Sequence, residues 1–412
     1  MIMRFVRIVI GYLSSRVEQL RMYKYRSKIP AKVRRMQQKE KIKVLFVLSD
    51  LSLWKSEALY LAMLEHSRFD PVLGVCLLEA DKPTEIIRKF NRLCVYLKDK
   101  KYEYVEISQK DIATKVNPDI IFYQQPYTGV IDPTLFFRFN LQALFCHISY
   151  AFNTTQMPWE GTMPYFHYCW HHYFENESTK ETRDRLMPRF IRNGVVTGVP
   201  IQDTLVSLSK TERNPWKNNA DRRKRIIWAP HHTISDGLLH YSTFLEIADD
   251  MVALAEKYKE EVWFSFKPHP FLYKRLVNKW GMGRTESYYA KWAQMENTQY
   301  DSGDYLGLFA YSDAMIHDCG SFTVEYLYTG NPVMYLVNGL PHTETLNDFG
   351  KAAYKVHYMG HTIEEIETFI RNILQGKDDM KEKRTAFVEE YLTLPNSKTA
   401  CQNIMDAILY GK

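Results

Sequence analysis

Three short polar stretches in the second half of the chain carry the residue types that bind phosphate groups. They occupy residues 229–233, 267–270 and 317–321, and each follows directly after a run of apolar residues. Their N–H and O–H groups can donate hydrogen bonds to an anion. The candidate ligand-binding residues in these stretches are His231, His232, Thr233, Lys267, His269, Asp318, Gly320 and Ser321. This set of residues favours the binding of a diphosphate.

The apolar runs before these stretches are predicted to be strands of one parallel sheet, with helices such as residues 242–258 between them. Because the carboxyl ends of parallel strands meet at one edge of a sheet, we expect the three polar stretches to converge there. A helix is expected to begin near Ser321, which would cap it and direct free N–H groups at the anion. Glu325, one turn further on, is predicted to bind ribose hydroxyls. The alternative is that Asp318 and Ser321 only cap a helix.

The first half of the chain shows the same alternation of strands and helices. Apolar runs at residues 42–50, 117–127 and 141–152 predict strands that are buried on both faces. Each run ends in polar or aromatic residues, so the ends of these strands are further candidates for ligand binding. No Gly-x-Gly-x-x-Gly motif follows the first strand, which excludes the usual dinucleotide fingerprint. Residues 203–224 are polar and contain Asn-Pro and Asn-Asn, as in a linker. The predicted fold class is α/β, with two Rossmann-like domains facing a cleft, the arrangement called GT-B.

Basic residues are concentrated at the N-terminus. Residues 1–43 contain 13 Lys and Arg and 2 Asp and Glu, a net charge of +11, whereas the whole chain carries +6. The remainder is therefore mildly acidic, which disfavours a nucleic-acid groove across the folded body. The apolar residues at 5–13 are interrupted by Arg7 and are too few to span a bilayer or form a signal peptide. A basic amphipathic arm on an anionic membrane surface is the preferred interpretation, and a solvated leader is the alternative.

Cysteine and histidine usage argues against a metal site. Six cysteines are scattered without a Cys-x-x-Cys pair, as in a protein of a reducing cytosol. The stretch 166–177 contains His167, His171 and His172, but its alternating aromatic residues favour a buried strand, in which neighbouring histidines point to opposite faces. No metal and no other cofactor are expected.

The order Trp-Ala-Pro-His-His-Thr, Phe-Lys-Pro-His-Pro and Ser-Asp-Ala-Met-Ile-His-Asp-Cys-Gly-Ser, within residues 225–340, resembles the C-terminal half of the CDP-glycerol glycerophosphotransferase family of teichoic-acid and capsule polymerases. The resemblance implies a GT-B fold, catalysis without metal, attachment to a membrane surface, and transfer of glycerol phosphate from CDP-glycerol. The family also carries a His-Gly-Thr motif in its N-terminal half, whose histidine is the general base. His147 is predicted to fill that role here, although Gly-Thr does not follow it, and His269 is the second predicted catalytic residue.

Two departures from the family pattern concern the donor site. Cys319-Gly320 stands where the family has Tyr-Ser, and Asn331 replaces the lysine before Pro332. A donor other than CDP-glycerol, such as CDP-ribitol or a nucleotide sugar, therefore stays open.

The resulting hypothesis assigns a role to each segment of the chain. The predicted divisions are a membrane-surface arm (1–40), an N-terminal acceptor domain (41–205), a linker (206–224), a C-terminal nucleotide-donor domain (225–390) and a C-terminal helix (391–412). The predicted reaction moves a polyol phosphate from a CDP-activated donor to a hydroxyl of a polymer or lipid-linked acceptor at the cytoplasmic face of the cell membrane, and releases CMP. The alternatives are a nucleotide-sugar glycosyltransferase and a non-catalytic scaffold of a polysaccharide assembly complex.

Overall fold

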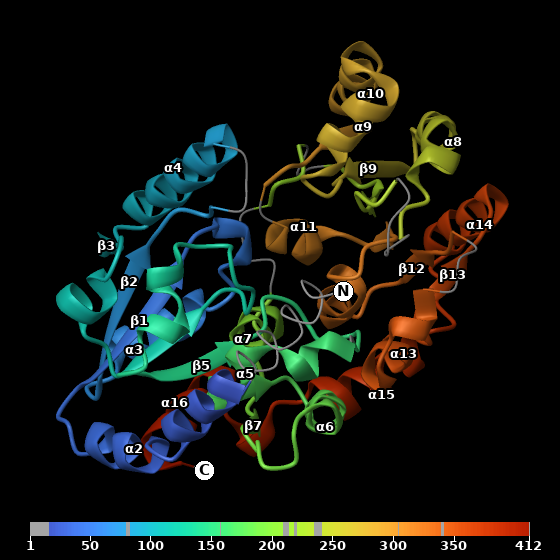
Figure 1. Cartoon of the computed structure of the whole chain (residues 1–412). Helices are drawn as coiled ribbons and strands as arrows, with labels where there is room; N and C mark the ends of the chain where they lie inside the picture. The colour runs from blue at the N-terminus through green and yellow to red at the C-terminus, as the bar shows by residue number, and fades with distance from the viewer. Residues whose placement is uncertain are drawn as a thin grey trace, which may run out of the picture. The chain divides into compact units, whose positions relative to one another are not determined.

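A computed structural model provides the structure of the chain. It describes residues 16–79, 83–156, 158–208, 214–217, 221–234, 241–303, 305–338 and 342–411. The chain divides into two compact units. Unit 1 comprises Met1–Ala151, Met157–Asp203 and Leu394–Lys412, and unit 2 comprises Phe152–Gln156 and Thr204–Thr393. Each unit contains one sheet, and Figure 1 shows how the helices surround the strands.

The sheet of unit 1 is entirely parallel and has the strand order β3-β2-β1-β4-β5-β6-β7. The central strands β1, β4 and β5 are buried because both faces of the sheet are covered there, as expected from their continuous apolar sequences, whereas β3 and β7 at the edges are not buried. The bounds are β1 (Ile42–Leu48), β2 (Phe69–Val75), β3 (Tyr104–Glu106), β4 (Ile120–Tyr123), β5 (Leu144–Ile148), β6 (His171–Phe174) and β7 (Gly194–Val196).

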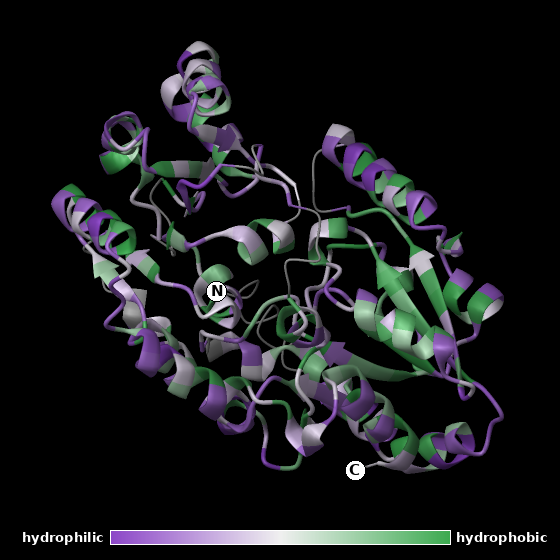
Figure 2. Ribbon diagram, turned by 180° about the vertical axis from the view of Figure 1, so that it is seen from behind, coloured by the Kyte–Doolittle hydropathy of each residue, from purple (hydrophilic) through white to green (hydrophobic). Residues whose placement is uncertain are grey.

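The helices of unit 1 carry their apolar residues toward the sheet. Figure 2 shows the strands of this unit mainly in the hydrophobic colour, whereas α4 alternates between hydrophobic and hydrophilic. Accordingly, the buried residues of α4 are confined to Leu93, Cys94 and Leu97. The bounds are α2 (Ile29–Gln37), α3 (Glu57–Glu65), α4 (Pro83–Asp99), α5 (Pro164–Tyr168), α6 (Glu177–Leu186), α7 (Pro200–Val206) and α16 (Ala400–Tyr410).

Much of the predicted N-terminal arm packs on unit 1 instead of standing apart from it. Its described part is helical over residues 16–26 and again in α2. Tyr25 is buried, stacks on Phe145, and donates a hydrogen bond to the carbonyl of Ala143 at 2.9 Å. Residues 1–15, which hold the first apolar run of the predicted arm, lie outside the described residues. No helix among the described residues has the length and apolar character needed to cross a membrane.

Unit 2 is built around a second parallel sheet with the order β10-β9-β8-β11-β12-β13. Figure 1 shows α9 and α10 beside β9, and α14 beside β13. The strands are β8 (Lys224–Ala229), β9 (Val262–Phe266), β10 (Thr298–Tyr300), β11 (Ala314–His317), β12 (Val333–Leu336) and β13 (Tyr358–Gly360). The helices are α8 (Phe244–Lys257), α9 (Leu272–Trp280), α10 (Met282–Gln294), α11 (Leu306–Tyr311), α12 (Phe322–Glu325), α13 (Asp348–Tyr354), α14 (Ile363–Leu374) and α15 (Lys381–Phe387).

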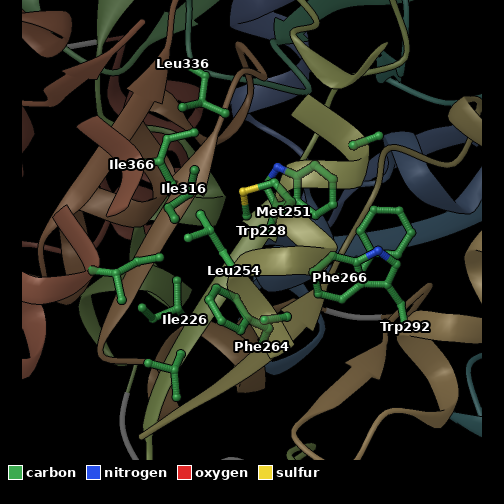
Figure 3. Close-up of a cluster of buried hydrophobic side chains, with 14 of the residues drawn as sticks. Ile226, Trp228, Met251, Leu254, Phe264, Phe266, Trp292, Ile316, Leu336 and Ile366 are labelled. Carbon is green, nitrogen blue, oxygen red and sulfur yellow. The ribbon is translucent and has the colours of Figure 1, made fainter. Parts of the chain in front are cut away.

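Aromatic side chains fill the core on one side of this second sheet. Trp228 of β8 packs against Phe266 of β9, Phe244 of α8 and Trp292 of α10, with ring centroids 5.1 to 5.6 Å apart. Figure 3 shows the rings of Trp228, Phe266 and Trp292 among aliphatic residues that come from both strands and helices. Dense packing of large rings fixes the strands whose ends carry the predicted site.

Two short segments belong to the other unit than their position in the chain suggests, and the predicted domain boundaries did not foresee this. Residues 152–156 belong to unit 2, and residues 394–412 return to unit 1, where Asp203 accepts hydrogen bonds from the first amides of α16. The predicted C-terminal helix at 391–412 is shorter than expected, since α16 covers Ala400–Tyr410. A hydrogen-bonding capping box at Thr399 sets its start.

Candidate active site

The three polar stretches of unit 2 follow neighbouring strands. β9, β8 and β11 are adjacent in the sheet, and all three run parallel. The stretches after Ala229, Phe266 and His317 therefore leave the same edge of the sheet, as the sequence indicates.

Three histidines from two of these stretches form a compact group. The ring centroid of His269 lies 4.2 Å from that of His232 and 5.1 Å from that of His231. The rings of His231 and His232 are 4.3 Å apart. All three side chains are half-buried, so each one still reaches solvent. Such a cluster can surround one small polar group.

The carboxylate of Asp318 holds the neighbouring stretches in place. It accepts hydrogen bonds from the backbone amide of His231 and from the amide and hydroxyl of Thr243, the last two at 2.7 and 3.1 Å. Its side chain is completely buried, and burial raises its pKa to about 6 although these bonds oppose the shift. Asp318 was predicted to bind substrate, but its acceptor positions are directed at the protein itself. It braces the end of β8 against the start of α8.

Hydrogen bonds to Nδ1 indicate which ring nitrogens carry protons. The Nδ1 of His269 accepts the amide of Phe271 at 3.1 Å, so in the neutral ring the proton is on Nε2. The Nδ1 of His231 lies 3.0 Å from the hydroxyl of Thr233, which also accepts the amide of Tyr241. The neutral ring of His269 is thereby set to offer its Nε2–H group.

These histidines are neutral near pH 7. Burial, then the charge of His232, then that of His269 lowers the pKa of His231 to about 2. Burial, then His232, then Lys267 lowers the pKa of His269 to about 3. The pKa of His232 is lowered as well, first by burial. A cluster of neutral N–H donors binds an anion through hydrogen bonds and accepts a proton more readily once the anion's charge is present.

The other predicted binding residues of unit 2 differ in how accessible they are to a ligand. Lys267 is 9 % exposed, and its ammonium group donates to the carbonyl of Gly303 at 2.8 Å. A Cβ atom added at Gly320 would have no atom of the described residues within 4 Å. Ser321 is exposed. Glu325 is 2 % exposed, so its carboxylate is not presented to solvent for a ribose.

The helix expected after Ser321 is much shorter than predicted. α12 has four residues and passes directly into a 3-10 turn at Tyr326–Thr329. Ser321 itself has helical backbone angles, and its side chain makes no capping hydrogen bond. The prediction that Ser321 caps a helix is therefore wrong, and anion binding by a helix dipole has no basis here, because one turn sums few peptide dipoles.

His147 of unit 1, the predicted general base, lies inside the protein. It is the last residue but one of β5 and is 4 % exposed, with the rings of Tyr165, Phe166 and His172 around it at 5.6, 5.1 and 4.8 Å. Burial, and then the charge of Arg183, lowers its pKa to about 3. A base must reach the hydroxyl that it deprotonates and have a pKa near the working pH. This environment suits neither requirement.

A partly exposed carboxylate, that of Glu160, is a better candidate for the base, because its oxygen can be reached and its pKa is raised. Glu160 lies in the 3-10 turn Pro158–Thr162, and its side chain is 34 % exposed. Its carboxylate pairs with the guanidinium of Arg183 at 3.4 Å, while burial raises its pKa and Arg183 opposes that rise. Arg183 is 6 % exposed and lies 3.9 Å from the ring centre of Phe166. The pair is thus fixed at one end and open to solvent at the other.

The residue after Glu160 explains why the turn sits so close to α6. A Cβ atom at Gly161 would lie 2.2 Å from the carbonyl oxygen of Leu186, so only glycine fits. The signal that sequence reasoning missed is Glu160-Gly161-Thr162. It keeps the Gly-Thr of the family motif His-Gly-Thr and has a glutamate in place of the histidine, 13 positions beyond His147.

The stretch 166–177 does not form a metal site in the described structure. His167 belongs to α5 and pairs through Nε2 with the carbonyl of Gly161 at 2.7 Å, while His171 and His172 are consecutive residues of β6. Within the described residues, the one group with ligand atoms close enough for a shared ion is His231, His232 and His269, whose ligand atoms lie within 4.8 Å of one another.

Comparison with protein families gives a match over most of unit 2 and part of unit 1. The family model for CDP-glycerol:poly(glycerophosphate) glycerophosphotransferase matches residues 171–410, which is more than half of the chain. No curated protein sequence matches the chain.

Solved structures with a similar fold include two kinds of enzyme. The wall teichoic acid polymerase TagF superposes with a TM-score of 0.58 at 14% identity, over 96% of this chain and 97% of that one. The UDP-GlcNAc 2-epimerase of Neisseria meningitidis, bound to UDP-GlcNAc, gives 0.58 at 17% identity, over 90% and 99%. S. aureus MnaA with UDP gives 0.56 at 13% identity, over 90% and 97%. These likenesses confirm the predicted GT-B fold of two Rossmann-like domains and, at such low identity, show the fold alone.

Proposed function

The chain belongs to the CDP-glycerol:poly(glycerophosphate) glycerophosphotransferase family and is an enzyme of that type, and we propose that it transfers glycerol phosphate, or a related polyol phosphate, from a CDP-activated donor to a hydroxyl of a polymer or lipid-linked acceptor. The donor phosphates would lie at the histidine cluster of unit 2. The acceptor would bind to unit 1. The released product is CMP.

The observation that carries this proposal is the group of three neutral histidines at the ends of β8 and β9. Their N–H groups, together with the ammonium group of Lys267, fit a diphosphate. As the acceptor oxygen bonds to the β-phosphorus, the bond from that phosphorus to CMP breaks and CMP keeps the electron pair. Hydrogen bonds from His269 and His231 would stabilise the charge that grows on the leaving phosphate.

Glu160 is the proposed acceptor of the hydroxyl proton. Its carboxylate is partly exposed and has a raised pKa, and Arg183 holds it in one orientation. A base with a raised pKa takes a proton more readily than an ordinary glutamate near neutral pH. His147 would serve this site indirectly, as part of the packed aromatic layer beside Arg183.

We also propose that the reaction needs no metal ion. The Nε2 of His269 carries the proton of the neutral ring because Nδ1 accepts an amide, so that nitrogen has no lone pair for a metal. The cluster therefore favours phosphate over a cation.

Calorimetric titration of the full chain with CDP-glycerol, CDP, UDP and GDP, with and without EDTA, tests the donor assignment. Binding of the cytidine ligands that persists in EDTA, followed by release of CMP with acceptor, is expected. Preference for UDP or GDP with release of a nucleoside diphosphate would identify a nucleotide-sugar glycosyltransferase instead. A protein that binds none of the four nucleotides would fit the scaffold alternative.

Attachment to the inner face of the cell membrane forms part of the proposal. Val17, Leu20 and Tyr23 lie on one side of the helix at residues 16–26 and are 57%, 69% and 49% exposed. Phe190 extends this patch through ring contact with Tyr23 at 5.2 Å. The exposed basic residues in the same two segments are Arg16, Arg21, Lys24, Arg189 and Arg192.

An apolar patch with a basic border fits an anionic bilayer surface. Sedimentation with vesicles that contain anionic lipid should fall for Leu20→Glu. It should persist for Leu64→Glu, which changes an exposed leucine of α3, outside the patch. Equal loss in both variants would contradict a specific patch.

A further inference from the structure

A pocket of unit 1 lies at the amino ends of its central strands. Its lining comes from the end of α2 and the residues after it, from residues 117–119 just before β4, and from Gln142 just before β5. Its volume is about 400 Å³, which lies within the range of small-molecule sites, about 300–1,000 Å³. Substrates of open parallel sheets bind outside the carboxyl ends of the strands. This pocket is therefore separate from the strand ends at which the acceptor is expected.

Hydrogen bonds hold the walls of this pocket in place. The amide of Asp119 donates to the carbonyl of Lys43 at 2.9 Å, which fixes the segment before β4 against β1. Asn117 has left-handed backbone angles (φ 47°, ψ 58°), which asparagine adopts more readily than most residues. The ammonium group of Lys32 donates to the carbonyl of Ala143 at 3.3 Å and so joins α2 to the loop before β5. The walls are thus in place without a ligand.

The lining carries two cations and one carboxylate. The ammonium group of Lys39 pairs with one oxygen of Asp119 at 2.6 Å, and the other oxygen accepts the amide of Lys43 at 3.1 Å. The guanidinium of Arg35 is exposed, and no acid among the described residues pairs with it. One positive charge of the lining is therefore left to bind an anion.

Basic residues around Arg35 add to this positive charge. Residues 28–43 contain seven Lys and Arg and a single acid, Glu40. Burial, then the charge of Arg35, then that of Lys28 lowers the pKa of Lys32 to about 8. Part of this lowering is repulsion between neighbouring cations, which a bound anion would relieve. The charge of the region thus favours an anionic ligand.

The rest of the lining narrows the ligand to a phosphate that carries hydroxyl groups. Arginine binds phosphate through parallel N–H groups. Asn117 and Gln142 are exposed, and their amides can donate to and accept from hydroxyls. Among the described residues, the lining contains no aromatic ring, and Pro118 is its one apolar residue. A nucleobase or the apolar face of a sugar would therefore have no ring to pack on.

We propose that this pocket is a second site for polyol phosphate, with the phosphate at Arg35 and the hydroxyls at Asn117, Gln142 and Asp119. The inference rests on the proposed function only in the choice of polyol, which is glycerol if the enzyme transfers glycerol phosphate. Two sources present this chemistry: a soluble polyol phosphate, and the headgroup of phosphatidylglycerol in a bilayer. The site holds the group, and no bond is formed or broken there.

Saturation-transfer NMR on the full chain tests the proposal with glycerol 3-phosphate as the probe. An excess of CDP keeps the probe out of the proposed donor site, and about 0.15 M salt screens distant charges. The probe is expected to bind, and Arg35→Glu is expected to weaken binding about tenfold, because a charge-assisted hydrogen bond is lost. The matched control is Arg34→Glu, at the neighbouring exposed arginine of α2 outside the lining, which should stay within about twofold of the unchanged protein.

Three results would overturn the proposal. The first is that glycerol 3-phosphate does not bind the unchanged protein. The second is that inorganic phosphate binds as strongly as glycerol 3-phosphate, since the hydroxyls would then make no contact. The third is that Arg35→Glu and Arg34→Glu weaken binding equally, which would reveal only a general attraction to a basic surface.

Sedimentation with phosphatidylglycerol vesicles distinguishes the two sources. If the lipid headgroup enters the pocket, Arg35→Glu lowers sedimentation more than Arg34→Glu does. If the pocket takes soluble polyol phosphate, the two variants sediment equally while their NMR results still differ.

Titration of Arg35→Glu with CDP-glycerol separates this site from the donor assignment. Because the pocket is not the proposed donor site, the affinity for CDP-glycerol should equal that of the unchanged protein. If CDP-glycerol fails to bind even the unchanged protein, the donor assignment fails, while the comparison of Arg35→Glu with Arg34→Glu still decides the pocket.

Discussion

Glu160 of unit 1 and Asp318 of unit 2 are both acids whose pKa is raised by burial, but their surroundings suit them to different roles. Asp318 is fully buried, and its carboxylate accepts three hydrogen bonds from the protein. Glu160 is partly exposed and has a single cationic partner, Arg183. The comparison shows that a raised pKa indicates in the first place that a carboxyl group is buried. Catalysis requires in addition an oxygen that substrate can reach.

The largest expected effect is that of Glu160→Gln, which removes the proposed base and keeps the shape of the side chain. We expect kcat to fall by about 10²- to 10⁴-fold, because general base catalysis contributes about that much. Affinity for CDP-glycerol, measured by calorimetry, should stay within about twofold. Glu177→Gln, at an exposed glutamate of α6, is the matched control and should keep full activity. A rate close to that of the unchanged enzyme in Glu160→Gln would remove Glu160 from the mechanism.

A pH profile sharpens this prediction. Since burial raises the pKa of Glu160, the carboxylate form that accepts protons is lost at a higher pH than for an ordinary glutamate. The acid limb of kcat should therefore lie above pH 4.5, the ordinary value for this side chain. The activity that remains in Glu160→Gln should not show this decrease at acid pH.

The next effect is that of His269→Ala in unit 2. The loss of one N–H donor to the leaving phosphate is expected to lower kcat by about 10²- to 10³-fold. His361→Ala removes a histidine from the surface of the same unit and should leave kcat unchanged. Single-turnover release of CMP measures both. Equal activity of the two variants would break the link between the histidine cluster and the donor phosphates.

The two units also differ in how much of the site could be predicted from the sequence. In unit 2, strands and polar ends follow one another in regular order, so β8, β9 and β11 and the grouping of His231, His232 and His269 could be predicted. The prediction that failed concerns local conformation at Ser321. Its backbone angles are helical, so this serine does not cap a helix although its position in the sequence suggests it. The hydrogen bonds that the Asp318 carboxylate accepts from backbone amides could not be predicted from the sequence, because the donors are 75 and 87 residues away.

In unit 1, β5 was predicted, but the environment of its last histidine was not. His147 lies at a strand end like His231, and only the packing of α5 and β6 shows that it is enclosed. Glu160 lies in a turn outside any regular element, where periodic patterns give no information. The close approach of Gly161 to Leu186 is a tertiary contact, so the tripeptide motif was its one sequence sign.

A smaller effect, on stability, is expected for Asp318→Ala. The amides of His231 and Thr243 would lose their acceptor inside the protein, which costs about 1–3 kcal/mol in the free energy of unfolding. Urea unfolding at pH 7 measures this cost, with Asp379→Ala at an exposed aspartate as the control. Activity should fall with the loss of order at the histidine cluster. Unchanged stability would show that Asp318 does not brace the strand ends.

The smallest effect concerns the dependence of stability on pH, where the two units have opposite signs. The pKa of His147 is about 3 in the folded protein and ordinarily 6.5, so the unfolded chain binds the extra proton. Its contribution to stability is complete above pH 6.5 and is lost as the pH falls, by about 2 kcal/mol at pH 5. The pKa of Asp318 is about 6 in the folded protein and ordinarily 3.8, so here the folded chain binds the extra proton and gains about 1 kcal/mol between pH 7 and pH 5.

Urea midpoints at pH 7 and pH 5 should therefore separate the two residues. His147→Phe is expected to reduce the loss of stability at pH 5, since a buried ring without a titrating nitrogen remains. Asp318→Asn is expected to increase that loss, because the gain from protonating the carboxyl group disappears. His361→Ala, at the surface, should leave the difference between the two midpoints as it is in the unchanged protein. If His147→Phe leaves the difference unchanged too, His147 reaches water in solution and its exclusion as the general base no longer holds.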